Sequence, residues 1–195
     1  MKQIWNPTTL LGPIPPVLVT CGSMDKPNVL TAAWTGIVNT KPPMCYISLR
    51  PERYSAPIIK ESGRFVINLP TEELVKSVDF CGVRSGRNTD KFATCRLTAE
   101  PSAHGVPMLA QSPISLECEV EQILPLGSHE LYLAKISAVH VEESLLDESG
   151  KLHIERAKLL AFAHGGYYAL GKRLGTFGYS VRKKPPISKG GKRRR

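Results

Sequence analysis

The sequence predicts a mainly β protein, an antiparallel barrel with a few short helices. Three observations support this prediction. Short runs rich in Val, Ile and Leu recur between Pro and Gly residues, as strands do. Two of the later runs alternate polar and apolar residues, which is typical of half-exposed antiparallel strands. The helical signals are few and do not alternate regularly with the strands, which disfavours a doubly wound sheet.

The elements are expected in the following order along the chain. Strands are predicted at 15–22, 44–49, 64–69, 114–124 and 129–141, and a neighbouring strand is predicted around Thr31. One helix is predicted from Ser55, its N-cap, to Gly63, with Pro57 in the first turn. A second helix is predicted to begin at Thr71, in TEELVKSVDF.

Length and charge indicate one domain and a tail. The chain has 195 residues and is 42% hydrophobic, which suits a single domain with a continuous core. No run of about 18 apolar residues and no cleavable leader appears, so we expect a cytoplasmic protein without a membrane segment. The formal charge is +9, but residues 182–195 hold eight basic residues and no acid. We therefore expect a nearly neutral domain over 1–181 and a basic, disordered tail over 182–195.

Several kinds of chemistry are disfavoured. The cysteines form no C-x-x-C pair, so buried reduced thiols are expected rather than a metal site; they are Cys21, Cys45, Cys81, Cys95 and Cys118. No G-x-G-x-x-G follows a strand, and GYYALGKR (166–173) lacks the Ser or Thr with which a P-loop holds magnesium. No Ser-His-Asp pattern stands in a recognisable nucleophile setting.

One stretch, TAAWTGIVNTKPPMCYISLRPERYS (31–55), has the makings of a phosphate site. Ser48, Arg50 and Ser55 lie where a strand ends and a helix begins, so hydroxyls, a guanidinium and free helix amides converge there. Thr31, Ala32 and Ala33 lie on a neighbouring strand, where small side chains let a flat ligand approach the main chain. The alternative is a solvated turn followed by a capped helix.

Five elements in this order resemble the flavin reductase family, and most closely its flavoredoxin-like members. They are NVLTAAW with the following V-x-N and Pro-Pro, SLRPERYS, FVINLP, SGRNTDKF (85–92) and LGKRLGTFGYS (170–180). The resemblance covers about residues 10–180. It implies a six-stranded antiparallel split β-barrel (Greek-key) that binds FMN and works as a homodimer, with the flavin near the subunit interface.

The resemblance also implies which residues bind the flavin. The expected contacts of the ribityl phosphate and the ring edge are Thr31, Ala32, Ala33, Trp34, Ser48, Leu49, Arg50 and Ser55. Lys91 matches a basic residue near the flavin, and the alternative is a surface lysine at a helix start. Asn68, Cys81 and Gly82 fall on the expected pocket wall. His164 lines the flavin face or packs in the core.

A further stretch, GSHELYLAKI (127–136), resembles the family's Gly-Asp-His motif for the nicotinamide donor. Gly127 and His129 match, whereas Ser128 stands where Asp is usual, which leaves the choice between NADH and NADPH open. The alternative interpretation of His129, which does not depend on the resemblance, is a partly exposed residue of a sheet.

Together these features predict an FMN-dependent oxidoreductase, a NAD(P)H:flavin reductase that passes electrons on to an acceptor. The cofactor supplies the chemistry, so no acid-base pair of the protein is required. Two alternatives stay open: a non-enzymatic FMN-binding electron-transfer protein, and a nucleic-acid-binding protein acting through the basic tail. The sequence does not identify the electron acceptor.

Overall fold

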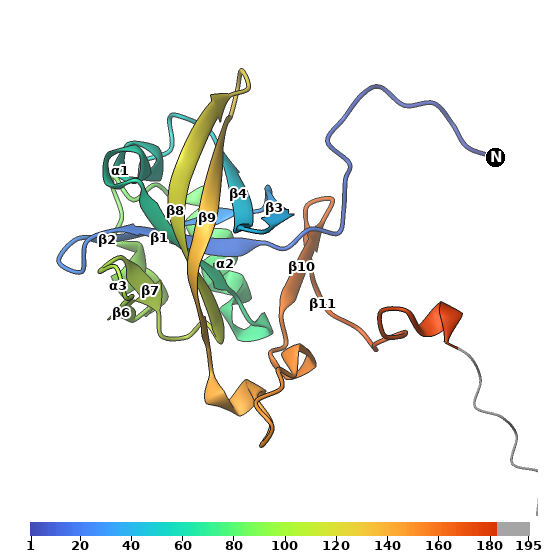
Figure 1. Cartoon of the computed structure of the whole chain (residues 1–195). Helices are drawn as coiled ribbons and strands as arrows, with labels where there is room; N and C mark the ends of the chain where they lie inside the picture. Colours follow the sequence, from blue (N-terminus) through green and yellow to red (C-terminus); the bar gives the residue numbers. More distant parts are fainter. Residues whose placement is uncertain (183–195) are drawn as a thin grey trace, which may run out of the picture.

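The computed structural model describes residues 1–182, so the tail expected over 182–195 lies, apart from Arg182, outside the described residues. Figure 1 shows a strongly curved sheet with short helices around it. The strands are β1 (Val17–Gly22), β2 (Pro27–Ala32), β3 (Thr35–Thr40), β4 (Pro43–Leu49), β5 (Arg64–Leu69), β6 (Ala99–Pro101), β7 (Pro107–Leu109), β8 (Ile114–Pro125), β9 (Glu130–Val141), β10 (Leu160–Ala163) and β11 (Gly166–Ala169). The helices are α1 (Ser55–Ser62), α2 (Val75–Val83) and α3 (Lys91–Cys95), with 3-10 turns η1 (Glu72–Leu74), η2 (Glu143–Leu145), η3 (Ile154–Arg156) and η4 (Tyr179–Val181).

The main sheet is antiparallel throughout, in the order β2-β1-β5-β8-β9-β4-β3. Its two edge strands, β2 and β3, are consecutive in the chain and are separated only by Ala33 and Trp34. The sheet must therefore curl until its edges approach, and β2 packs against β4 at this corner. The result is an open barrel. The main sheet has seven strands, whereas the resemblance implies six. The additional strand is β3, which pairs with β4 at the edge of the sheet.

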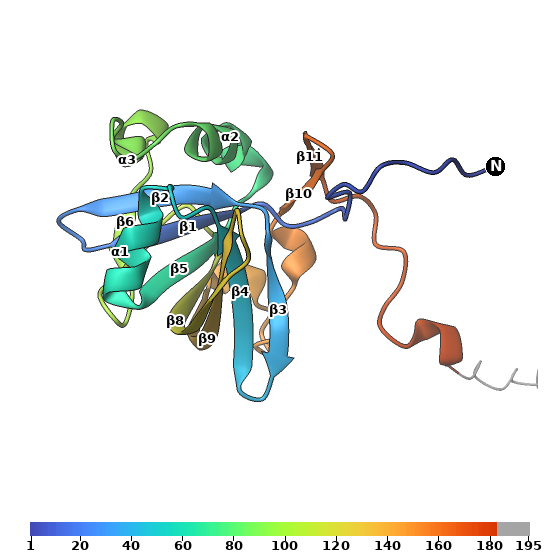
Figure 2. The ribbon, with the colours of Figure 1, turned by 90° about the horizontal axis from the view of Figure 1, so that it is seen from above.

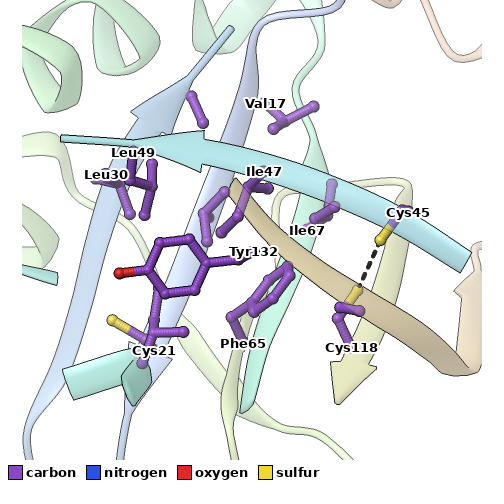
Figure 3. Close-up of a cluster of buried hydrophobic side chains, with 14 residues drawn as sticks. Val17, Cys21, Leu30, Cys45, Ile47, Leu49, Phe65, Ile67, Cys118 and Tyr132 are labelled. Atoms are coloured by element: carbon purple, nitrogen blue, oxygen red, sulfur yellow. Dashed lines mark hydrogen bonds between the residues drawn. The ribbon is translucent and has the colours of Figure 1, made fainter. Parts of the chain in front are cut away.

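The barrel interior is the main hydrophobic core. Inward-facing residues of β1, β4, β5, β8 and β9 meet there, as the alternation of side chains along a strand requires. Figure 3 shows Tyr132 and Phe65 at the centre of this cluster. The thiols of Cys45 and Cys118 also face each other, with the two sulfurs 3.5 Å apart. Cys21, Cys45, Cys81 and Cys118 are buried and Cys95 is half-buried, and all five are free thiols, as the sequence predicts.

A second layer covers the outside of the sheet. Figure 2 shows α2 and α3 lying over β1 and β2, with α1 crossing one end of the barrel. The side chains between these layers form a separate core, in which Leu18 and Val29 of the sheet meet Val78, Cys81 and Phe92 of the helices. The helices thus fix the outer face of the β2 strand, which leads into the corner.

The predicted strands are confirmed: β5 spans 64–69, and β1, β4, β8 and β9 agree with the expected ranges within two residues. The helix from residue 55 ends at Gly63, whose φ of +66° is the left-handed conformation that favours glycine. Its N-cap is Tyr54, however, so the expectation that Ser55 caps the helix is wrong. The Ser55 hydroxyl is buried and accepts a hydrogen bond of 2.6 Å from the Asn28 amide instead. None of the helices in the described part of the chain is both long enough and apolar enough to span a bilayer.

Candidate functional site

The corner between β2 and β3 brings several of the predicted site residues together. The Ser48 N–H donates to the Trp34 carbonyl over 2.8 Å, which joins β4 to the turn. The Thr31 hydroxyl donates to the Val78 carbonyl of α2, and the Thr35 hydroxyl donates to the Tyr46 carbonyl over 2.7 Å. Side-chain and backbone hydrogen bonds thus hold this corner, so its small residues form a rigid edge.

A cavity of about 170 Å³ lies beside the corner, where the chain passes from β4 into α1. Its lining includes the side chains of Arg53 and Arg84, both exposed, and of Ser85. Arg53 also donates to the carbonyl of Gly82 at the end of α2, over 3.0 Å. Two guanidinium groups and a hydroxyl around a small cavity are the donor set that binds a phosphate group. Glu52 is the one carboxylate in this lining.

Lys91 lines this cavity and is only 5% exposed, so the alternative of a surface lysine is wrong. Its ammonium donates to the carbonyls of Val29 and Cys81, over 2.8 and 2.9 Å, and so ties β2 to α2. An ammonium has three N–H groups, so one is left for the cavities that Lys91 lines. Burial is the main cause that lowers the pKa of Lys91, with Arg53 adding to it, while the Cys81 thiol opposes it.

Trp34 and His129 meet at the other end of the corner. Their ring centroids are 4.4 Å apart with a tilt of 37°. The Trp34 side chain is 41% exposed, so one side of this pair is open. The Ser128 hydroxyl lies 3.0 Å from His129 Nδ1, and Gly127 takes the φ of +84° that the β8–β9 turn requires. The hydroxyl in place of the usual carboxylate thus still contacts the imidazole, but brings no charge.

Successive contacts link these residues, and we call the set of residues the corner strip. It runs from the small cavity, with Arg53, Arg84 and Ser85, past Gly82 to Thr31, and on to Ser48, Trp34 and His129. A Cβ on Gly82 would lie 3.4 Å from Cβ of Thr31, so α2 and β2 approach closely beside the strip. The strip has basic side chains at one end, small and polar side chains in the middle, and aromatic side chains at the other end.

Other predicted residues lie away from the strip. The Asn68 side chain is fully buried: its amide donates to Leu18 and Thr20, and its oxygen accepts from Leu109 and Ser115, all within 2.9 Å. The side chains of Ala32 and Leu49 point into the barrel core, although their backbones border the corner.

Cys81 and His164 also lie away from the strip. The Cys81 thiol is buried between α2 and the sheet, and burial, with the nearby Cys95, raises its pKa to about 12. His164 is exposed in the turn between β10 and β11 and is not in the core. Arg50 is exposed at the end of β4 and does not line the small cavity.

Sequence reasoning missed Arg53, Arg84 and Ser85. The signal was present, since Arg53 lies inside SLRPERYS and Arg84 directly precedes SGRNTDKF. The choice of Arg50 followed from its place at the strand end, whereas the turn of residues 50–53, closed by the Arg53 N–H to the Arg50 carbonyl at 3.1 Å, brings Arg53 over the cavity instead.

A larger cavity of about 950 Å³ lies on the other side of Tyr54 and Gly86. It is bordered by the β1–β2 turn, by α1 and by the loop 86–90 with the start of α3, and its lining mixes acids such as Asp25 and Glu61 with Lys26 and Arg87. Gly86 makes the partition between the cavities possible, because a Cβ there would lie 2.2 Å from Oδ1 of Asn28.

Comparison with known proteins shows the family and the fold to which this chain is similar. Residues 12–171 match the family described as flavin reductase like domain. The structure superposes on that of flavoredoxin of Desulfovibrio vulgaris (Miyazaki F) with a TM-score of 0.86 and 33% identity, over 93% of this chain and 100% of that one. A protein of Archaeoglobus fulgidus is 32% identical over 151 residues, which are 77% of this chain and 84% of its own. An NADH-dependent FMN reductase of Streptomyces nodosus subsp. asukaensis is 27% identical over 127 residues, 65% of this chain and 68% of its own.

The open antiparallel barrel and its superposition on flavoredoxin and on an FMN-binding protein of Thermus thermophilus confirm the predicted fold class, a split β-barrel. The chain belongs to the flavin reductase family.

Proposed function

We propose that the protein is an FMN-dependent oxidoreductase that takes electrons from NADH or NADPH and passes them to an acceptor. Membership of the flavin reductase family supports flavin oxidoreduction in general. The observation that carries the specific proposal is the corner strip, whose chemistry changes along its length as the parts of FMN do. FMN has an anionic phosphate at one end, a polar ribityl chain and a flat ring.

The residues present fit this cofactor. Arg53 and Arg84 would hold the phosphate with charged hydrogen bonds, and Ser85 would add a hydroxyl. The Lys91 ammonium, with its third N–H, would add positive potential to the cavity that it lines. The backbone from Thr31 to Trp34, with Ser48 opposite, would border the ring. The small side chains of Ala32 and Ala33 leave room for the ring to approach this backbone. Arg50 would lie at the solvent edge of the ligand.

The protein's own part in the reaction is placement. Bound FMN would supply the hydride- and electron-transfer chemistry. Trp34 and His129 would hold the nicotinamide donor at the open end of the strip, and the Ser128 hydroxyl would orient the imidazole. Holding two reactants in a fixed geometry is a large contribution on its own, so no acid-base residue is required.

The phosphate assignment is tested by FMN titration of Arg84→Ala, with Arg87→Ala as the matched control. Arg87 is three residues away but lines the larger cavity. Loss of one charged hydrogen bond, about 1.5–3 kcal/mol, should weaken FMN affinity roughly 10- to 150-fold in Arg84→Ala. Arg87→Ala should change it less than about twofold. If Arg87→Ala weakened FMN affinity more than Arg84→Ala, the phosphate would be assigned to the larger cavity instead.

A non-enzymatic FMN-binding protein is the second candidate. It would bind FMN as tightly but would not oxidise NADH or NADPH in a steady-state assay with added FMN. Sustained oxidation that depends on the protein favours the reductase, and its absence favours the carrier. The proposal also includes a cytoplasmic homodimer whose domain spans residues 1–181, with no role for nucleic acid.

A further inference from the structure

Two segments of the chain project from the domain. Residues 1–13, the N-terminal arm, precede the bridge between Ile14 and Phe162, whose two backbone hydrogen bonds are 2.9 and 2.8 Å long. Residues 170–182, the C-terminal arm, follow β11. Figures 1 and 2 show both arms leaving the same side of the molecule, beyond the β10–β11 hairpin. The bridge fixes the base of the N-terminal arm to the body.

Both arms expose large apolar side chains. In the N-terminal arm these are Ile4, Trp5, Leu10 and Leu11, and in the C-terminal arm Leu174, Phe177, Tyr179 and Val181. Single exposed apolar residues are common, but two whole segments that expose almost every large apolar side chain indicate an interaction surface. The arms need a partner to cover them.

The strand β3 offers a matching surface on the body. It is an edge strand, so one row of its backbone groups has no partner strand among residues 1–182. Ile37 and Val38 are 65% and 49% exposed, and consecutive residues of a strand point to opposite faces, so β3 is open on both faces. Figure 2 shows the β3–β4 hairpin extending away from the barrel. β3 begins directly after Trp34, so its open surface continues the corner strip.

The exposed apolar area favours a second copy of this chain as the partner. The arms carry four basic residues and no acid, whereas residues 14–169 hold 15 basic and 17 acidic residues. The net charges are therefore +4 for the arms and −2 for the body, so charge does not oppose the packing of an arm on the body of another copy. Buried aromatic side chains cover about 150–250 Å² each, so Trp5, Phe177 and Tyr179 of two chains supply roughly 900–1,500 Å². That approaches the roughly 1,200–2,000 Å² of a stable interface before any Leu is counted.

We propose that two copies exchange their arms, so that the arms of each chain pack on the β3 edge of the other and cover the open end of its corner strip. This goes beyond the dimer expected for the family, because it assigns the contact to named segments. The covering of the strip rests on the proposed function, whereas the exchange itself does not.

The exchange is tested by sedimentation. Wild-type protein should sediment at twice the chain mass of 21.4 kDa, and Leu174→Asp/Phe177→Asp should sediment as single chains. Ile37→Asp, on the receiving strand, should also do so. Ile154→Asp is the matched control: its side chain is 50% exposed on η3, outside the arms and β3, and the variant should stay dimeric. A monomeric wild type, or a dimer that survives both the arm and the β3 substitutions, overturns the proposal.

A second readout needs no arm variant. Trp5 and Trp34 are the two tryptophans of the chain, so in Trp34→Phe the emission reports on Trp5 alone. Its emission should lie at shorter wavelength at high protein concentration and shift to longer wavelength on dilution. A solvent-like emission at all concentrations overturns the exchange.

The effect on the strip is measured separately. FMN affinity should fall several-fold in Leu174→Asp/Phe177→Asp and stay unchanged in Ile154→Asp. Unchanged affinity in the monomeric arm variant overturns the covering of the strip. Failure of the wild type to bind FMN would refute the proposed function and leave the sedimentation result to decide the exchange.

Discussion

Replacement of Lys91 by Met tests whether this lysine acts as an internal brace of the corner. The ammonium makes two buried hydrogen bonds, to a strand and to a helix, at 2.8 and 2.9 Å. Met keeps most of the apolar stem but leaves the carbonyls of Val29 and Cys81 without this donor. The Val29 carbonyl belongs to β2 and the Cys81 carbonyl to α2, so the two elements lose this link and keep the hydrogen bond from Thr31 to Val78.

The magnitude follows from these two bonds. Hydrogen bonds from a charged donor contribute roughly 1.5–3 kcal/mol each. The ammonium itself loses hydration on burial, which lowers its pKa and offsets part of this gain. We therefore expect Lys91→Met to reduce the free energy of unfolding by about 2–4 kcal/mol.

Urea unfolding measures this change directly, as a lower midpoint at an unchanged m-value. The matched control is Lys76→Met, an exposed lysine of α2, which should change the stability by less than about 0.5 kcal/mol. If Lys91→Met lowers the free energy of unfolding by less than about 1 kcal/mol, and by no more than the control does, Lys91 does not stabilise the contact between β2 and α2.

Two further predictions concern acid stability and the donor. Burial opposes ionisation of Glu117, but hydrogen bonds from His140, the Ala103 N–H and His104 outweigh it and lower its pKa from 4.5 to about 2. Because the folded-state pKa is depressed, this stabilisation is complete above about pH 4.5 and is lost as the pH falls towards 2; it amounts to about 3 kcal/mol. Urea midpoints between pH 6 and pH 2 should therefore fall less steeply for Glu117→Gln than for wild type, and parallel curves would contradict the assignment. His129→Ala should raise the KM for NADH or NADPH while FMN affinity stays unchanged; loss of FMN alone would place His129 at the cofactor rather than the donor.

The strands were predictable because their signals are local. In β5, the run RFVINL stands between Gly63 and Pro70 and coincides with the observed strand. Gly63 ends α1 as expected, since the left-handed conformation there favours glycine. The role of Ser55 could not be read in the same way. A serine at a helix start usually caps it, but here the partner is Asn28, 27 residues earlier, which only the folded chain brings near.

The region of the candidate site could be predicted from the sequence, but the residues that line its cavity could not. The stretch 31–55 does contain the corner, because β2 and β4 meet there. Which arginine lines the cavity depends on the turn after β4, and this turn favours Arg53 over Arg50. The pairing of Trp34 with His129, 95 positions apart, follows from the register of β4 with β9, in which Leu49 lies opposite Glu130.

Asn68 shows the limit of sequence reasoning most clearly. The resemblance to the family predicts Asn68 on the pocket wall, and in the structure its side chain has four hydrogen-bond partners inside the protein. Buried amides with complete hydrogen bonding stabilise a fold, and local sequence does not distinguish them from ligand contacts.

A crystal structure of the protein with FMN tests the central claim most directly. We expect the phosphate within about 3 Å of the guanidinium groups of Arg53 and Arg84, and the ring along Thr31–Trp34. FMN bound in the larger cavity beside Arg87, or a corner strip that stays empty at saturating FMN, would contradict the account.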